Sequence, residues 1–447
     1  MQEIFSPNSI AVIGASNDEK KWGGKIVKNI LDGGYTGSVY PINTKEKIIQ
    51  GLTSYASVLE VPGEIDLAVI VVPALAVLAV VDECGRKNIK GLVVISAGFA
   101  ETGNKVLEEE LQSKVDQYDM MLVGPNCLGI ANNSMGLNAS ILQEMPKKGN
   151  ISFVAQSGTM ALAITEWAKE KNIGLNIIIS TGNKTALDDV DYLEYLDADP
   201  NTKVIGIYAE SIKRGRRFLE VAKRIKKPIV ILKVGRSKKG AAAAFSHTSS
   251  LAGADEIFSA AFKQAGVIRV DTLDELFDAI QVLSMQPLPK GNTVGVCSNG
   301  GGAGIIAVDE CAKLGIDVPD LTTEMVEKIK LVMPGFASAA NPVDSAARSD
   351  YNIYKTILDT FNNDLFDAII PIFVQDSSAN PVPSATSIIS LVTDKPIIAC
   401  SMGGERKKEW NKLLEESNIP IFPSPDRAIR GLSYLLQHRK FLEEIKL

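Results

Sequence analysis

The sequence predicts an α/β protein of three domains, each built on a doubly wound parallel β-sheet. Its 447 residues are enough for about three domains of ~100–200 residues each. Short β-branched runs alternate with segments of helical apolar spacing along the whole chain, a pattern typical of parallel sheets covered by helices. Two similar segments, PKKGN (146–150) and PLPKGN (287–292), each precede a strand, a loop with Ser and Gly, and a helix.

These two segments are expected to be exposed linkers, and they place domain boundaries near residues 140 and 288. The predicted domains are therefore 1–140, 141–287 and 288–447. In the first domain a helix is expected at Ala74–Lys87. Strands are expected at Ser9–Ile13, Ser38–Tyr40, Leu67–Val72, Gly91–Ser96 and Met121–Val123.

Composition narrows the classes of function. The net charge of −6 provides no overall basic field that would favour nucleic acid. The basic run Lys213–Arg217, with Lys223–Lys227 after it, is expected to form a solvated helix face. The longest apolar run, Leu67–Val81, is interrupted by Pro73 and is shorter than the ~20 residues that cross a bilayer. It predicts a buried strand, a turn and a helix, and no membrane association.

The N-terminus and the cysteines favour a cytoplasmic protein. The first residues, MQEIFSPNSIAVIGAS, lack the basic and apolar segments of a signal peptide. The five cysteines have no metal-ligand spacing, so reduced thiols and no metal site are expected.

The first predicted strand runs into a loop, Ala15–Gly24, that is followed by a helix. A strand, a Gly/Ser loop and a helix N-terminus together form an anion site. The loop lacks the G-x-G-x-x-G pattern, and the second strand ends in NTK (43–45) rather than in the acidic residue that binds an NAD ribose. Lys45 there suits a ligand with an extra ribose phosphate, which both CoA and NADP carry. The other lysines nearby are Lys20, Lys21 and Lys25. A sheet of this kind without a ligand is the alternative.

Three further turns follow predicted strands of the first domain. They are Val71–Pro73, Ser96–Glu101 and Gly124–Cys127. Because ligands of open parallel sheets bind at the carboxyl ends of the strands, these turns are expected to line the ligand crevice.

The chain has two histidines, and one of them lies in an unusual segment. His438 is expected on the surface of a C-terminal helix. His247 lies in GAAAAFSHTSSLAGAD, where small residues leave the ring accessible in a loop that leads into a helix near Asp255. Neutral imidazole is a nucleophile near pH 7, and its attack on a phosphoryl group gives a phosphohistidine. Glu210, which ends the strand VIGIYAE, is the candidate acceptor for the other ring nitrogen; capping the following helix is its alternative role.

The phosphate requires donors, and a second strand–loop–helix unit offers them. Ser157, Gly158 and Thr159 end a strand and open the helix MALAITEWAKE. Their backbone N–H groups and two hydroxyls predict a phosphate site that the helix dipole supports. The loop Ser180–Lys184 follows the next strand and is expected to complete the wall of this site.

The turns of the first domain resemble those of the CoA-binding domain of succinyl-CoA synthetase and its relatives. The resemblance implies that the GAS-type loop and the lysine after the second strand hold the nucleotide of CoA. It also implies that the Val-Pro and Pro-Asn-Cys turns lie along the pantetheine arm. The residues carried over are Gly14, Ser16, Lys45, Val72, Pro73, Asn126 and Cys127. Cys127 is expected beside the CoA thiol rather than as a nucleophile, and a plain buried cysteine is the alternative.

The later segments resemble the ligase domains of NDP-forming acyl-CoA synthetases. SHTSSLAG, SGTM and the YAES strand end match the phosphohistidine domain of that family, so the resemblance to this point covers about 280 residues. SNGGGAG (298–304), NPVD (341–344) and IPIFPSPDRAI (419–429) resemble the C-terminal ligase domain of the archaeal-type enzymes. The implied fold is a Rossmann-like CoA-binding domain followed by two flavodoxin-like ligase domains. For the Gly-rich loop a phosphate site, a tight turn and a subunit contact remain open.

The resemblance implies an acid-thiol ligase subunit that interconverts acyl-CoA, ADP and phosphate with carboxylic acid, CoA and ATP. The reaction would pass through an acyl phosphate and a phosphohistidine at His247. No stretch of the chain remains for the ATP-grasp domain that binds Mg²⁺ and the nucleotide, so a separate β subunit and an α2β2 heterotetramer are expected. Acetate, branched-chain, aryl and hydroxy acids all fit. A CoA-sensing regulatory protein is the alternative, and an NADP-dependent oxidoreductase is a weaker one that leaves SHTSSLAG unexplained.

Overall fold

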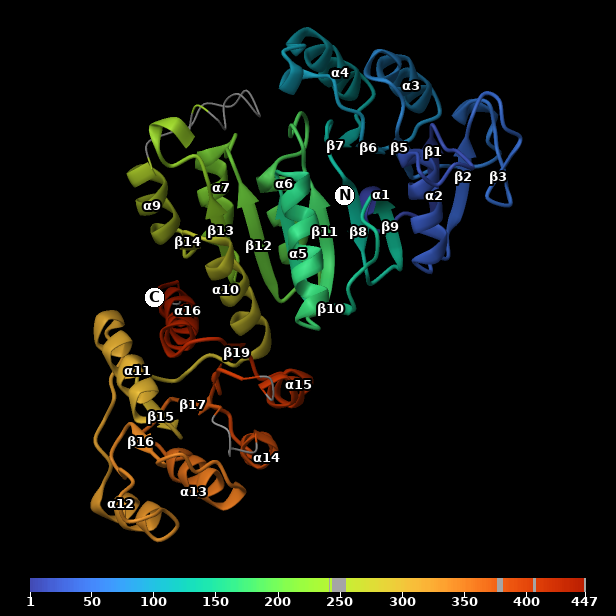
Figure 1. Cartoon of the computed structure of the whole chain (residues 1–447). Coiled ribbons are helices and arrows are strands. Elements are labelled where there is room, and N and C mark those ends of the chain that lie inside the picture. The colour runs from blue at the N-terminus through green and yellow to red at the C-terminus, as the bar shows by residue number, and fades with distance from the viewer. Residues whose placement is uncertain (241, 243–254, 376–380, 405–406, 446–447) are drawn as a thin grey trace. The chain divides into compact units, whose positions relative to one another are not determined.

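The computed structural model describes residues 1–240, 242, 255–375, 381–404 and 407–445. The chain divides into two compact units, Met1–Leu276 and Phe277–Leu447 (Figure 1). Within the described ranges, the first unit holds a five-stranded and a seven-stranded sheet with a small two-stranded ribbon, and the second unit holds another five-stranded sheet.

The first sheet has the strand order β2-β1-β5-β6-β7, and all of its neighbouring strands are parallel. Its strands are β1 (Ser9–Ile13), β2 (Ser38–Ile42), β5 (Leu67–Ile70), β6 (Gly91–Val94) and β7 (Met121–Val123). The ribbon joins β3 (Ile48–Ile49) to β4 (Leu52–Thr53). The helices around the sheet are α1 (Gln2–Phe5), α2 (Trp22–Asp32), α3 (Ala74–Arg86) and α4 (Lys105–Gln117). Helices α3 and α4 lie side by side on one face, and α2 lies on the other (Figure 1).

Burial on both faces explains why these strands are apolar throughout. All five residues of β1 are buried. Alternate side chains point to opposite faces of a strand. Accordingly, Ile10 and Val12 join the hydrophobic cluster that contains Ile26 of α2, whereas Ala11 joins the cluster that contains Val77 of α3. A sheet covered by helices on both faces is the predicted doubly wound arrangement.

The seven-stranded sheet has the order β14-β13-β12-β10-β11-β8-β9. Its parallel strands are β10 (Lys148–Ala155), β11 (Leu175–Ser180), β12 (Val204–Ala209), β13 (Ile229–Lys233) and β14 (Ile268–Val270). The strands β8 (Gly129–Asn132) and β9 (Leu137–Ser140) form a hairpin that adds antiparallel to β11. The helices are α5 (Gly158–Glu170), α6 (Asp189–Ala198), α7 (Gly215–Ala222) and α9 (Asp255–Gln264).

The β8–β9 hairpin is an antiparallel addition that the sequence did not reveal. It follows the first sheet along the chain but pairs with the second. Asn29 of α2 donates to the carbonyl of Ser140 (2.8 Å) and to that of Leu142 (2.6 Å). The hairpin is therefore hydrogen-bonded to a helix of the first sheet while its strands extend the second sheet.

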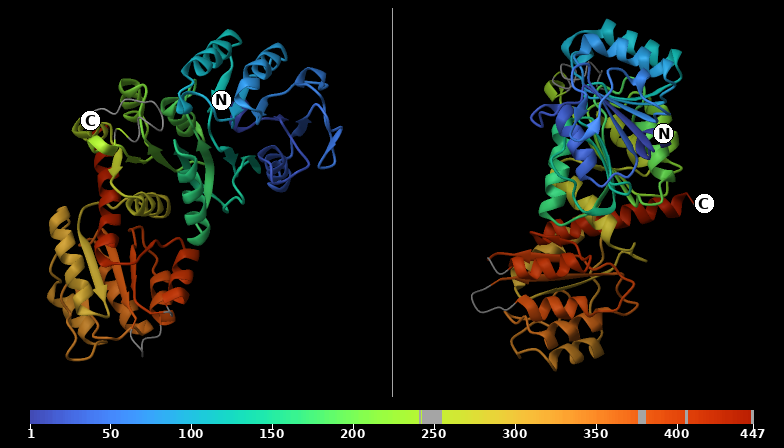
Figure 2. Two further views of the ribbon diagram at one scale, coloured as in Figure 1. Left: turned by 45° about the horizontal axis from the view of Figure 1, so that its top comes forward. Right: turned by 90° about the vertical axis from the view of Figure 1, so that its right-hand side faces the viewer.

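The sheet of the second unit has the order β16-β15-β17-β18-β19 and is parallel, with helices beside it in both views of Figure 2. Its strands are β15 (Val294–Ser298), β16 (Val343–Asp344), β17 (Ala368–Val374), β18 (Ala399–Met402) and β19 (Ile421–Phe422). The helices are α10 (Leu273–Met285), which contains the boundary between the units, and α11 (Gly301–Leu314), α12 (Thr323–Lys330), α13 (Tyr351–Phe361), α14 (Pro381–Ile389), α15 (Lys407–Glu416) and α16 (Pro425–Glu444).

The same topology recurs in all three sheets. In each sheet the first parallel strand in chain order has the second parallel strand on one side and the third on the other; in the seven-stranded sheet this first parallel strand is β10, which follows the β8–β9 hairpin. The two crossovers therefore leave the first strand in opposite directions, and the point between the first and third strands is the topological switch point. Ligands of open α/β sheets bind outside the carboxyl ends of the strands at this point.

Two expectations about side chains are corrected. His438 was expected on the surface, but it is buried on α16, at helical spacing from the buried Leu435 and Phe441. The run Lys213–Arg217 is a solvated helix face only in part. All four basic residues of the run are exposed, but Lys213 and Arg214 precede α7, and Arg214 forms a bidentate ion pair with Asp188 (2.6 Å).

Two further observations bear on the class of protein. No helix in the described part of the chain is both long and apolar enough to cross a bilayer. All five cysteines fall within the described ranges, where they are buried free thiols.

Candidate functional site

The switch point of the seven-stranded sheet lies between β10 and β12. These strands are in register at Ala155 and Tyr208, and the N–H of Gln156 continues the pairing with the Tyr208 carbonyl (3.0 Å). The Gln156 side chain then accepts hydrogen bonds from the N–H groups of Glu210 (2.9 Å) and Ser211 (3.0 Å). One side chain therefore fixes the backbone of the loop after β12 against the loop after β10.

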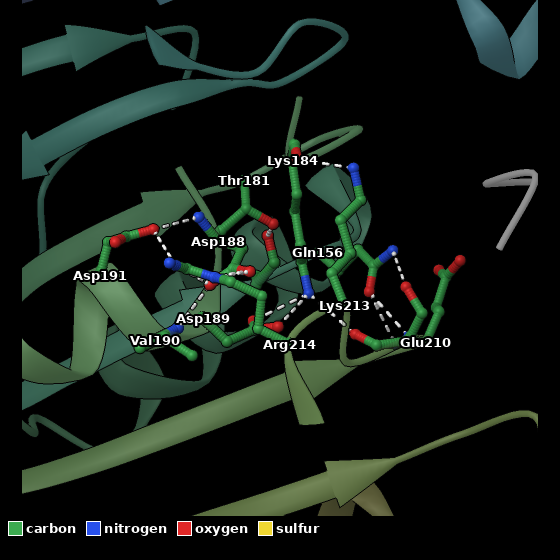
Figure 3. A network of polar contacts seen from close by, with 12 residues as sticks. Gln156, Thr181, Lys184, Asp188, Asp189, Val190, Asp191, Glu210, Lys213 and Arg214 are labelled. Carbon is green, nitrogen blue, oxygen red and sulfur yellow. Dashed lines mark hydrogen bonds and ion pairs between the residues drawn. The ribbon is translucent and has the colours of Figure 1, made fainter. Parts of the chain in front are cut away.

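Glu210 lies at this edge, directly after β12, and only 6% of it is exposed. In Figure 3 its carboxylate points away from Lys184 and Asp189. The capping alternative is wrong, because the N-cap of α7 is Arg214, four residues further along. His247 lies outside the described residues, so its pairing with Glu210 stays a prediction.

The N-terminus of α5 supplies the predicted phosphate donors. Ser157 is the N-cap, and Gly158 and Thr159 are the first helical residues. Their N–H groups have no acceptor within the helix, because the first turn of any helix lacks one. The hydroxyls of Ser157 and Thr159 lie 2.9 Å apart. The helix continues for 13 residues, so its dipole adds positive potential at this end.

A buried ion pair supports the loop between β11 and α6. Lys184, in the left-handed region at φ 56°, donates to both carboxylate oxygens of Asp189 (2.8 and 2.7 Å) and to the Ser211 carbonyl (3.1 Å) (Figure 3). Both side chains of the pair are almost fully buried. Lys213 in turn donates to the Lys184 carbonyl (2.6 Å). The loops after β11 and β12 are thereby fastened together beside Glu210.

In the first sheet, the predicted nucleotide-binding residues lie at the carboxyl ends of β1 and β2. Gly14 has φ +90°, and a Cβ atom there would lie 2.4 Å from the Val71 carbonyl oxygen, so only glycine fits. Asn43 donates to the Ala15 carbonyl (2.8 Å) and accepts from the N–H of Lys45 (2.8 Å). Asn43 therefore holds the two loops together and leaves the Lys45 side chain exposed. Ser16 is buried, and its hydroxyl accepts from the N–H of Asp18 (3.1 Å).

The predicted pantetheine turns are also neighbours. Val72 and Pro73 lie between β5 and α3, and the Ser96 hydroxyl donates to the Val72 carbonyl (2.5 Å). The N–H of Asn126 donates to the Ser96 carbonyl (2.9 Å). Cys127 is buried, and that burial raises the pKa of its thiol to about 12, so it is not a thiolate nucleophile.

One pocket is lined both by two of the predicted CoA-binding residues and by the three predicted phosphate-binding residues. It has a volume of about 230 Å³. Its lining residues are Trp22, Ile95, Ala97, Asn126, Cys127, Leu128, Gln156, Ser157, Gly158, Thr159, Gly182 and Asn183. The structure thus brings Asn126 and Cys127 to the N-terminus of α5. The other predicted CoA residues and Glu210 are not part of this lining.

Asn183 connects the two sheets at the pocket wall. It donates to Glu101 (2.7 Å) and Glu108 (2.8 Å) and accepts from Asn126 (3.2 Å). Burial alone would raise the pKa of Glu101, but hydrogen bonds from the Gly98 N–H and from Asn183 hold it below its ordinary value. Glu101 is therefore an ionised anchor for the turn after β6.

Sequence reasoning missed Ile95 and Leu128 as lining residues. Leu128 directly follows the Pro-Asn-Cys turn, and Ile95 directly precedes the turn Ser96–Glu101, so proximity to a predicted turn was a usable signal for both. Trp22 lies within the predicted anion loop Ala15–Gly24 and Ala97 within the predicted turn Ser96–Glu101, so the sequence had already indicated the loop or turn that carries each of them.

Family models match two segments of the chain. Residues 8–133 match the CoA binding domain, and residues 148–283 match the succinyl-CoA ligase like flavodoxin domain. The first match contains the turns of the first sheet, and the second contains Ser157–Thr159 and Glu210.

Curated relatives match over nearly the whole chain. The α subunit of ADP-forming acetate–CoA ligase II from Pyrococcus furiosus is 41% identical over 452 residues, covering 98% of this chain and 97% of the relative. ADP-forming acetate–CoA ligase I from Archaeoglobus fulgidus is 40% identical over 446 residues. In that case the match covers 98% of this chain but only 64% of the longer relative.

A solved structure has a closely similar fold. It is the dinucleotide forming acetyl-coenzyme A synthetase 1 of Ca. Korarchaeum cryptofilum in complex with phosphate and ADP. The TM-score is 0.95 at 38% identity, and the match covers 100% of this chain and 98% of that chain.

Proposed function

Because the chain belongs to the family of ADP-forming acetate–CoA ligase α subunits, within the succinyl-CoA ligase superfamily, we propose that it interconverts acyl-CoA, ADP and phosphate with carboxylic acid, CoA and ATP. The observation that carries this proposal is the pocket in which the Asn126–Cys127 turn meets the N-terminus of α5. That pocket puts a predicted pantetheine-binding turn beside a predicted phosphate site, and the first chemical step joins those two groups.

In the ATP-forming direction the reaction has three steps. Inorganic phosphate attacks the thioester carbonyl, a C–O bond forms, the C–S bond breaks, and CoA leaves as the thiol. The imidazole of His247 then attacks phosphorus, a P–N bond forms, and the carboxylate leaves. Finally an oxygen of ADP attacks the same phosphorus, which regenerates the imidazole and yields ATP. Splitting one transfer in this way replaces a difficult step by easier ones.

The described residues have distinct roles in this scheme. The N–H groups of Ser157, Gly158 and Thr159 bind the phosphate oxygens at the helix N-terminus. Glu210 accepts a hydrogen bond from the second imidazole nitrogen and stabilises the charge that develops on the ring. Gln156 and the Lys184–Asp189 pair act on Glu210 indirectly, because they fix the backbone that carries it.

CoA is proposed to bind along the carboxyl edge of the first sheet. Gly14, Ser16 and the exposed Lys45 would hold its nucleotide, and Val72, Pro73 and Asn126 would contact the pantetheine arm. The residues fit this ligand because Gly14 leaves room for close approach and Lys45 is free to reach a ribose phosphate.

A second polypeptide with an ATP-grasp domain is proposed to bind Mg²⁺ and the adenine nucleotide. The names of the Pyrococcus furiosus relatives, which are α subunits, support a β partner. The greater length of the Archaeoglobus fulgidus relative supports the same division, because this chain spans only 64% of it. We further propose an α2β2 heterotetramer.

Labelling His247 from both directions tests the mechanism. The chain is mixed with its ATP-grasp partner and either Mg-ATP or an acyl-CoA with radioactive phosphate. Both routes should label the same residue, with an acid-labile and base-stable bond that distinguishes phosphohistidine from phosphoserine. His247→Asn should abolish labelling and turnover, and Glu210→Gln should slow labelling by about 10²–10⁴-fold. Near-normal ATP synthesis by His247→Asn would replace this mechanism with the CoA-sensing alternative.

Calorimetry with CoA and dephospho-CoA tests the ligand. CoA should bind about 10- to 100-fold more tightly, because a charge-assisted contact with the ribose phosphate contributes roughly 1.5–3 kcal/mol. Lys45→Met should remove most of that preference. The matched control is Lys90→Met, because Lys90 precedes β6 at the opposite edge of the sheet. Equal affinities for the two ligands in the wild-type chain would exclude the contact with the ribose phosphate, and tight binding of NADP without binding of CoA would exclude CoA as the ligand.

A further inference from the structure

We propose that Leu128 determines which acyl groups the pocket accepts, an inference that rests on the proposed function. Leu128 lies between the two parts of the pocket. It is the residue after Cys127, at the predicted thiol end, and it also contacts the N-terminus of α5, at the predicted phosphate end.

The Leu128 side chain lies directly against the first residue of α5. A Cβ atom placed on Gly158 would be 2.7 Å from Cγ of Leu128, and 3.0 and 3.2 Å from its two methyl carbons. The isobutyl group therefore occupies the space over the phosphate donors that any larger side chain at position 158 would need.

The backbone of Leu128 is held on both sides, which fixes the point from which its side chain extends into the pocket. Its N–H donates to the Ser180 hydroxyl (2.9 Å), and its carbonyl accepts from the N–H of Ile141 (3.0 Å). The first of these contacts ties it to the end of β11, and the second ties it across the β8–β9 hairpin. A fixed apolar group is suited to discriminating substrates by size.

The reaction places the acyl carbon next to Leu128. In the acyl phosphate that carbon is bonded to a phosphate oxygen, and in the thioester it is bonded to sulfur. Its substituent must fit between the thiol end and the phosphate end of a pocket of about 230 Å³, which is smaller than the ~300–1,000 Å³ of sites for drug-sized ligands.

The pocket can discriminate between acyl groups by their size but not by their charge. None of the residues that line the pocket is charged at neutral pH. The apolar ones are Trp22, Ile95, Ala97 and Leu128, and of these Leu128 is the side chain shown to contact the start of α5. Shortening it should therefore enlarge the acyl end of the pocket and leave the charge of the lining unchanged.

Steady-state kinetics of the complete enzyme, with its ATP-grasp partner, test this inference. The measured quantity is kcat/KM for isobutyrate divided by kcat/KM for acetate. Leu128→Ala should raise this ratio by about 10-fold or more, because a methylene-sized change in an apolar pocket alters discrimination by about 10- to 200-fold. Leu128→Met, which nearly conserves volume, should change the ratio far less.

Two controls keep the outcome decisive. Leu162→Ala alters an exposed leucine on α5, the helix that Leu128 contacts, and should leave the ratio unchanged. If Leu128→Ala unfolds, Leu128→Val should show a smaller change in the same direction. An unchanged ratio in an active, folded Leu128→Ala or Leu128→Val enzyme overturns the role of Leu128 and leaves the proposed function intact. Absence of turnover with every acid in the wild-type complex overturns the proposed function and this inference together.

Discussion

The loops after β10 and β15 have the same sequence pattern but different local chemistry. Both follow the first parallel strand of a sheet with the same topology, and both open a helix, α5 in one unit and α11 in the other. After β10, Gln156 binds the neighbouring loop, and the N-terminus of α5 lines a pocket. After β15, Asn299 also binds the neighbouring strand β17, but the Ser298 hydroxyl is used within its own loop.

The loop after β15 is held by its own serine and by the end of β17. The Ser298 hydroxyl accepts from the N–H of Gly300 (3.0 Å). Asn299 exchanges two hydrogen bonds with the backbone of Val374 (2.7 and 2.8 Å). The carboxylate of Asp344 lies where a Cβ atom on Gly301 would be 2.7 Å away. An acidic group beside the start of α11 disfavours phosphate, which leaves the tight turn and the subunit contact as interpretations of the Gly-rich loop.

The two edges also differ in buried charge. The buried polar residues near the carboxyl edge of the seven-stranded sheet include Glu210, Lys184, Asp189 and Lys233. Those at the described edge of the sheet in the second unit, such as Ser298, Asn299, Ser345 and Ser401, are neutral. Burying charge costs free energy unless it is paired, so its concentration at one of two similar edges favours a functional origin there. A shared strand–loop–helix pattern therefore identifies a possible anion site, and the neighbouring loops decide whether one forms.

The largest expected effect follows from adding a side chain at Gly158, where the loop after β10 opens α5. Gly158→Val should lower turnover by about 10²–10³-fold, because the added methyls displace Leu128 and cover the phosphate donors. Binding of CoA, measured by calorimetry, should persist. The matched variant is Gly302→Val, because a Cβ atom at Gly302 meets open space. Strong loss of turnover in Gly302→Val would show that the second loop is also functional and would break the comparison.

A large effect on stability is expected from the buried ion pair. Lys184→Met leaves the Asp189 carboxylate buried without its cation and should lower the free energy of unfolding by about 3–5 kcal/mol. Urea unfolding of the intact chain measures this. Lys184→Met combined with Asp189→Leu should recover much of the loss, because an apolar pair can replace a buried ion pair.

The neutral edge provides the control for that measurement. Asn299→Ala removes two hydrogen bonds to Val374 and should cost less, about 1–3 kcal/mol. If Lys184→Met lowered the free energy of unfolding no more than Asn299→Ala does, the buried charges would contribute no more to stability than the neutral polar groups of the other edge.

The sequence predicted the parts of the fold and site that depend on local patterns. Strand ends and helix starts at Ser157–Thr159 and after β12 follow from apolar periodicity and from the loop residues between them. The expected parallel α/β class is confirmed by the sheets and by the matched family domains. Whether Ser157–Thr159, Glu210 and the CoA set act as proposed stays a prediction.

The parts that the sequence did not predict depend on contacts between distant segments. The Pro-Asn-Cys turn indicates the region of Leu128, but its contact with α5 depends on the β8–β9 hairpin returning against β11, and no local pattern predicts that pairing. Lys184 lies in a polar loop, where a lysine is ordinarily exposed, yet it is buried in an ion pair with Asp189. His438 lies among polar residues, but its spacing from Leu435 puts it on the buried stripe of α16.

The smallest expected effect concerns Lys233, which ends β13 at the charged edge. It is buried in register with Ala209, next to the strand end that carries Glu210, and its ammonium lies 5.0 Å from the centre of the Phe258 ring. Burial, together with the nearby Arg269, lowers the pKa of Lys233 to about 8. In the unfolded chain a lysine titrates near pH 10.4.

The sign of the pH dependence follows from these two values. Between about pH 8 and pH 10.4 the unfolded chain binds more protons at Lys233 than the folded chain, so this residue makes stability rise with pH in that window. Lys233→Met lacks this dependence. Its stability relative to the wild type should therefore be most favourable at pH 7 and should fall as the pH rises from 8 to 10, by on the order of 1 kcal/mol once solvent screening is allowed for.

The loss of the hydrogen bond from Lys233 to the Val234 carbonyl shifts the whole curve, so the slope with pH is the informative quantity. Thermal unfolding of both proteins across this range measures it, with Asn299→Ala as a control that removes no titratable group. A stability difference for Lys233→Met that stays constant from pH 7 to pH 10 would mean that Lys233 keeps an ordinary pKa, and that the carboxyl edge of the seven-stranded sheet perturbs its buried lysine no more than solvent does.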